Sequence, residues 1–171
     1  IGISASWAFL DLLASEKGLP HDAVGTVLAI AFLVCGLGGF IAAALEDRIG
    51  RIPPVAGIIL LNLAGLWLLA HFTGIAGYAA GSMLFLFSVN FTLAYSFGLT
   101  AEVDAGGRLI TLSAASLSIG AIAGPATAGR LIEAAGYEAA LGFSALCSLG
   151  TLILYLAVIR LAGKKRRTAI S

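Results

Sequence analysis

Long uninterrupted runs of apolar residues are the feature that most limits the structures open to this chain. The clearest run covers residues 24–45 and contains no charged side chain. A helix needs about 20 residues to cross the hydrocarbon of a bilayer, whereas transmembrane strands are about half as long and alternate in polarity. Because backbone groups in lipid must bond within their own segment, such runs predict transmembrane helices.

Six such runs are predicted, separated by short polar or charged segments. The expected spans are residues 1–14, 24–45, 55–72, 75–99, 109–132 and 139–161, followed by a basic tail at 162–171. Of the 171 residues, 60% are hydrophobic and only 11% are charged, and a water-soluble domain of this size could not bury so much apolar surface. The predicted fold class is therefore an all-α membrane protein with six transmembrane helices.

Basic residues predict the orientation of these spans. If the spans alternate across the membrane, the loops at 46–54 and 100–108 lie on the same side as the tail. Of the basic residues, only Lys17 and Arg130 then lie on the other side. Lys and Arg concentrate on the cytoplasmic side, so both loops and the tail are expected in the cytoplasm, beneath the inner membrane of the cell. With a net charge of only +1, the basic tail favours anionic lipid over nucleic acid as its partner.

The few polar side chains within the apolar runs are the candidates for a solute or proton site. Asp11 is the only acid well inside a run, and its spacing places it on one helical face with Trp7. An acid inside a membrane often marks a proton or cation site, and the alternative is an interfacial position just before Glu16. Asn90 lies in mid-run near Tyr95, where it either bonds across helices or lines a cavity.

Two further segments contain residue types that suit a particular geometry. Gly50 permits a sharp reversal in the loop at 47–51, although a solvated turn that only obeys the charge rule would look the same. Gly120 and Gly124 lie four residues apart in the fifth run and suit a close approach of two helices, and the adjacent Pro125 favours a kink. The sequence contains neither G-x-S-x-G nor H-E-x-x-H, so we expect no enzyme activity, cofactor or metal.

Both segments resemble signatures of the major facilitator superfamily. The segment Ala43-x-x-x-Asp47-Arg48-x-Gly50-Arg51 is similar to the loop signature G-x-x-x-D-R-x-G-R-R, with Ala43 in place of the leading Gly. The segment Gly120-x-x-x-Gly124-Pro125-x-x-Ala128-Gly129 resembles the G-x-x-x-G-P-x-x-G-G signature of drug-efflux antiporters. The run at 75–99 lacks the Arg expected in the first half of such carriers, so the resemblance favours the C-terminal half, with its three-plus-three inverted repeat.

The resemblance implies a secondary transporter that moves a small organic solute by alternating access, with proton-coupled efflux as the expected mode. The implied partners are the bilayer, an N-terminal six-helix half missing from this sequence, the solute and the proton. The implied cavity residues are Trp7, Asp11, Asn90 and Tyr95. The implied cytoplasmic gate consists of Ala43, Asp47, Arg48, Gly50, Arg51, Glu102, Asp104 and Arg108. Helix packing and bending are assigned to Gly120, Gly124, Pro125 and Gly129. The alternatives are an assembly subunit and a six-span membrane enzyme without a recognisable motif.

Overall fold

The computed structural model describes residues 1–45, 52–103 and 106–168, with residues 52, 99, 102–103 and 158–168 described by their backbone alone. Every regular element in this part of the chain is a helix. The elements are α1 (Gly2–Trp7), α2 (Leu10–Glu16), α3 (His21–Leu45), α4 (Ile52–His71), α5 (Ile75–Val103) and α6 (Arg108–Thr168).

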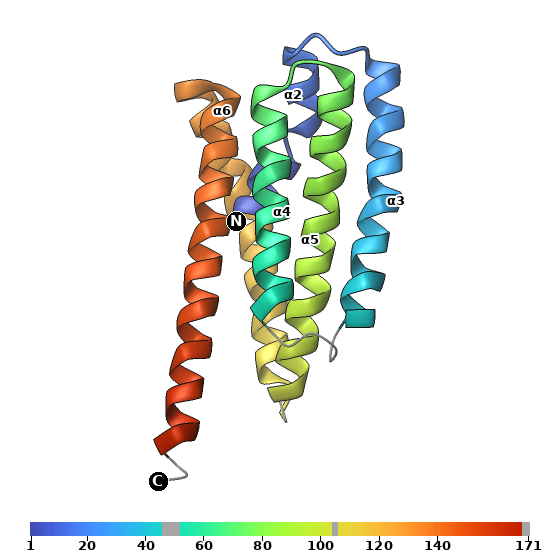
Figure 1. Cartoon of the computed structure of the whole chain (residues 1–171). Coiled ribbons are helices and arrows are strands. Elements are labelled where there is room, and N and C mark those ends of the chain that lie inside the picture. The colour runs from blue at the N-terminus through green and yellow to red at the C-terminus, as the bar shows by residue number, and fades with distance from the viewer. Residues whose placement is uncertain (46–51, 104–105, 169–171) are drawn as a thin grey trace.

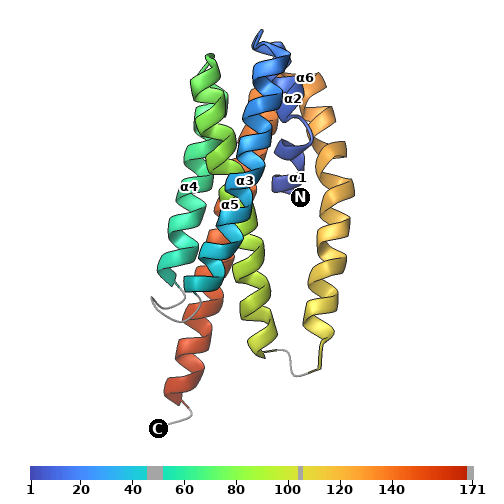
Figure 2. The same ribbon diagram turned by 90° about the vertical axis from the view of Figure 1, so that its right-hand side faces the viewer.

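The long helices lie side by side in one bundle and run alternately up and down (Figures 1 and 2). The ends of α3 and α5 lie at the same end of the bundle as the starts of α4 and α6 and the C-terminus (Figure 1, bottom). The connections from α2 to α3 and from α4 to α5 lie at the opposite end. The two loops expected in the cytoplasm are thus flanked by helix ends that lie at the same end of the bundle as the end of α6.

Helix α6 consists of two arms that fold back on one another (Figure 2). Its backbone is non-helical only at Gly136, with φ 79° and ψ 178°, a conformation that is essentially limited to glycine. The chain therefore reverses at Gly136, within the polar segment that separates the fifth and sixth expected runs. We call residues 108–135 the first arm and residues 137–168 the second arm.

Four helices in the described part of the chain are long and apolar enough to cross a membrane. They are His21–Leu45, Pro53–His71, Ile75–Gly98 and Arg108–Ala157, the last of which includes both arms of α6. The first expected run is not one helix, because α1 ends at Trp7 and α2 begins at Leu10. The structure is thus that of a multi-pass helical membrane protein, while six separate spans and an inverted repeat stay predictions.

Helix α5 occupies the middle of the bundle because small residues let its neighbours approach closely. Gly38 of α3 lies directly against the backbone of Phe87, and Gly65 of α4 lies against Gly81. A Cβ atom added at Gly65 would be 3.0 Å from the carbonyl oxygen of Gly81. Small residues of this kind allow backbone contact between helices in membranes. The main apolar core, which includes the fully buried Phe85, forms around α5.

Candidate functional site

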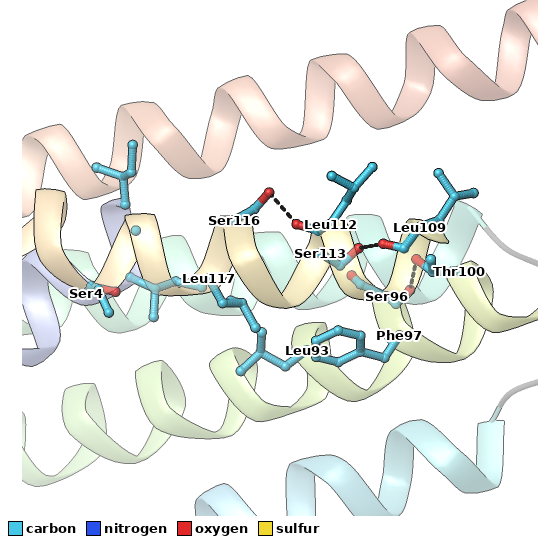
Figure 3. Close-up of a pocket in the computed structure, with 14 residues that line it drawn as sticks. Ser4, Leu93, Ser96, Phe97, Thr100, Leu109, Leu112, Ser113, Ser116 and Leu117 are labelled. Carbon is cyan, nitrogen blue, oxygen red and sulfur yellow. Dashed lines mark hydrogen bonds between the residues drawn. The ribbon is translucent and has the colours of Figure 1, made fainter. Parts of the chain in front are cut away.

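A cavity lies between α5 and the first arm of α6, next to the start of the chain (Figure 3). Its volume is about 780 Å³, within the range of small-molecule binding sites. The residues that line it are Ile1, Ile3, Ser4, Leu93, Ser96, Phe97, Thr100, Leu109, Leu112, Ser113, Ser116, Leu117, Gly120 and Ala121.

The wall of this cavity is apolar with a scattering of hydroxyl groups. Leucines and Phe97 form most of it, and the hydroxyls come from Ser4, Ser96, Thr100, Ser113 and Ser116. Among the described residues that line it, none has an ionisable side chain. A wall of this kind binds mainly by excluding water from apolar surface, with a few polar groups to orient the bound molecule.

Three of these hydroxyls form hydrogen bonds within their own helices (Figure 3). Thr100 Oγ1 donates to the carbonyl oxygen of Ser96 at 2.8 Å, as Ser113 Oγ does to that of Leu109 at 2.9 Å and Ser116 Oγ to that of Leu112 at 2.8 Å. A hydroxyl has one proton and two lone pairs. Because the proton is already used, each oxygen remains available mainly as an acceptor.

The four residues predicted to line the cavity do not line this one. Asn90 Nδ2 donates to the carbonyl oxygen of Cys35 at 2.8 Å and so ties α5 to α3. Of the two interpretations left open for Asn90, the structure shows the bond across helices. Tyr95 is buried and stacks on Phe91.

Trp7 and Asp11 lie in the N-terminal segment, away from the cavity wall. Trp7 is exposed and makes an edge-to-face contact with Phe32 of α3, with ring centroids 5.0 Å apart. Asp11 lies in the first turn of α2 and is exposed. The hydroxyl-bearing wall was therefore not predicted from the sequence. The signal available for it was hydroxyl side chains three or four residues apart on two consecutive runs, at Ser96 and Thr100 and again at Ser113 and Ser116.

Most of the expected gate residues fall outside the described part of the chain. This holds for Asp47, Arg48, Gly50, Arg51 and Asp104, and for the side chain of Glu102. Ala43 is exposed near the end of α3, and Arg108 is exposed at the start of α6. Both lie at the bundle end that carries the C-terminus (Figure 1).

The glycines of the fifth run lie against α1. A Cβ atom added at Gly124 would be 2.6 Å from the carbonyl oxygen of Ile1, and one added at Gly120 would be 3.0 Å from the backbone nitrogen of Ile1. Gly129 has looser surroundings, since its nearest such contact is the ring of Phe9 at 3.9 Å. The backbone of α6 stays helical at Pro125, and the chain reverses at Gly136 instead.

A buried set of polar side chains joins α1, α4, α5 and the second arm of α6. Asn62 Nδ2 donates to Ser88 Oγ at 2.8 Å, and Ser148 Oγ lies 3.0 Å from Asn62 Oδ1. Ser6 Oγ donates to Ser144 Oγ at 2.7 Å, and that hydroxyl in turn donates to the carbonyl oxygen of Gly2. Buried polar groups cost free energy unless they are bonded, so these bonds fix which helix faces meet.

Lys17 closes the opposite end of the bundle. Its Nζ donates to the carbonyl oxygens of Ala70 at 3.1 Å and Phe72 at 2.9 Å, at the end of α4 where helix carbonyls lack partners. Burial lowers the pKa of Lys17, and the negative charges of Glu138 and Glu16 partly offset this effect. Lys17 thus connects the α2–α3 turn to the end of α4.

Comparison with known protein families gives a match that covers almost the whole chain. A family model described as Major Facilitator Superfamily matches residues 1–170. No curated protein and no solved structure matches the chain.

Proposed function

Because the chain belongs to the major facilitator superfamily, we propose that it supplies one half of a secondary transporter that moves a small organic solute by alternating access. Family membership and the apolar helices make it a multi-pass membrane transporter. The finer proposal is proton-coupled efflux across the inner membrane of the cell. The observation that carries the proposal is the cavity of about 780 Å³ beside the first arm of α6.

The open side of this cavity supports the proposal of a companion half. Leu112 and Leu117 line the cavity and are still 62% and 44% exposed. Leucines this exposed in a concave wall are covered in the membrane either by lipid or by a further apolar protein surface. We expect that surface from a second six-helix unit, either in the same polypeptide or in a second chain, with the solute bound between the two.

The coupling proton is assigned to Asp11. Asp11 is exposed in this chain, so its place in a coupling site requires the companion half to cover it. Asp11→Asn should then abolish the dependence of transport on a pH gradient, with surface expression unchanged. The matched control is Asp22→Asn, which removes another exposed acid, from the first turn of α3. Gradient dependence that survives in Asp11→Asn would remove this residue from the coupling site.

The cavity itself is tested by filling it. Ser116→Phe places a ring in the cavity, and Ser118→Phe adds the same ring on the same helix to an exposed residue outside the lining. Efflux of fluorescent organic solutes should be lost in cells expressing Ser116→Phe and kept in cells expressing Ser118→Phe, at equal amounts of membrane protein. Normal efflux by Ser116→Phe would place the transport path elsewhere. An absence of solute movement by the unmodified chain when it is expressed together with its companion half would overturn the transport proposal.

A further inference from the structure

We propose that this half of the cavity selects an uncharged, amphipathic solute that donates hydrogen bonds. This inference rests on the proposed function and specifies the class of solute. It combines two observations on the described lining residues: none has an ionisable side chain, and three of their five hydroxyls donate to carbonyl oxygens of their own helices.

The absence of charged side chains from the described lining residues disfavours ionic solutes. A carboxylate, phosphate or ammonium group loses water when it enters an apolar cavity, and that loss is costly without an opposite charge nearby. Arg108, which precedes the lining residue Leu109, is exposed at the start of α6 and is not part of the lining. On this wall an ion would therefore be desolvated without an oppositely charged side chain among the described lining residues.

The orientation of the hydroxyls sets the polarity of the hydrogen bonds. Ser113 Oγ and Ser116 Oγ donate to carbonyl oxygens four residues earlier in α6, so their lone pairs are what a solute meets. Thr100 Oγ1 of α5 repeats the arrangement. To donate to a solute, each hydroxyl would first have to break its bond within the helix. The part of the wall formed by Thr100, Ser113 and Ser116 thus favours an O–H or N–H group on the solute over a carbonyl or ether oxygen.

The apolar side chains between these hydroxyls define the remainder of the solute. Leu93 and Phe97 project from α5, while Leu112 and Leu117 project from the first arm of α6 (Figure 3). The structure therefore suits a flat or compact apolar body with a donor at its edge. An ammonium group is the closest competitor, because it also donates, and it differs from the expected solute only in its charge.

Four matched probes separate charge from donor capacity. Naphthylmethanol is uncharged and donates, its methyl ether is uncharged and does not donate, naphthoate is an anion, and naphthylmethylammonium is a cation. Binding is measured by equilibrium dialysis of the purified chain in nanodiscs, with empty nanodiscs subtracting partition into lipid. We expect naphthylmethanol to bind about tenfold more tightly than its ether, since one or two neutral hydrogen bonds contribute that much. It should also bind more tightly than either ion, because an ion loses its hydration on this wall.

The serine variants assign this preference to the cavity. The double variant Ser113→Ala/Ser116→Ala should bind the alcohol and the ether equally. Ser118→Ala removes a hydroxyl with the same kind of backbone bond outside the lining, so it should keep the preference. Equal binding of alcohol and ether by the unmodified chain, or tighter binding of either ion, would overturn the inference. A preference in nanodiscs without efflux in cells would support this inference and count against the transport proposal alone.

Discussion

At the scale of single residues, the hydrogen bonds of Asn62 show which substitutions the bundle should tolerate. Ser88 Oγ accepts from Asn62 and also donates to the carbonyl oxygen of Phe85 at 2.7 Å. Ser148 Oγ likewise lies within reach of the carbonyl oxygen of Ser144 as well as Asn62. Removing Asn62 therefore leaves both serines with a partner, whereas removing Ser88 leaves the buried amide with an unpaired donor.

These hydrogen bonds predict which of two substitutions, Asn62→Leu or Ser88→Ala, destabilises the protein more. Asn62→Leu should lower the free energy of unfolding by about 1 kcal/mol, the usual contribution of hydrogen bonds between membrane helices. Ser88→Ala should cost more, up to about 3 kcal/mol, because an unsatisfied buried donor keeps its full desolvation penalty. Thermal unfolding of purified protein in detergent measures both, with Thr151→Ala as a control that removes an exposed hydroxyl bonded to its own helix. If Asn62→Leu instead destabilised the protein more than Ser88→Ala, the Asn62 amide would not depend on Ser88 as its hydrogen-bond partner.

At the scale of helices, hydropathy predicted most of the fold because each run must match the thickness of the bilayer. Helix α3 ends at Leu45 and α5 begins at Ile75, where the corresponding runs were expected to end and begin. The interruption between Trp7 and Leu10 could not be predicted, because neither Gly nor Pro marks it. The cavity could not be predicted either, since its hydroxyls show only which faces are polar and not which of those faces meet.

Helix packing makes opposite predictions for two glycines of α6. A Cβ atom at Gly124 would collide with backbone atoms of Ile1 and Ala5, while one at Gly142 would have nothing within 4 Å. Gly124→Ala should therefore destabilise the protein by about 1–3 kcal/mol, because α1 has to move away. Gly142→Ala should stabilise it by up to about 1 kcal/mol through helix propensity. Thermal unfolding of both variants checks this, and equal effects would mean that α1 does not lie against the first arm.

At the scale of the whole molecule, the bundle predicts that its two ends lie on opposite sides of the membrane. Gly106 lies between α5 and α6, and Gly74 lies between α4 and α5, at the other end (Figure 1). Both are exposed, and a Cβ atom added to either would have nothing within 4 Å. We therefore expect both positions to tolerate cysteine. The two natural cysteines, Cys35 and Cys147, are first replaced by alanine so that only the introduced thiol can be labelled.

Thiol labelling in intact cells then determines the orientation. The excess of Lys and Arg at the end that carries the tail predicts that this end is cytoplasmic. A membrane-impermeant maleimide should label Gly74→Cys in intact cells and label Gly106→Cys only after the membrane is permeabilised. The opposite labelling pattern would mean that the protein has the inverse orientation in the membrane, with the expected gate at the outer surface. Labelling of both positions from outside would contradict the alternation of α5 across the membrane, on which the half-transporter architecture depends.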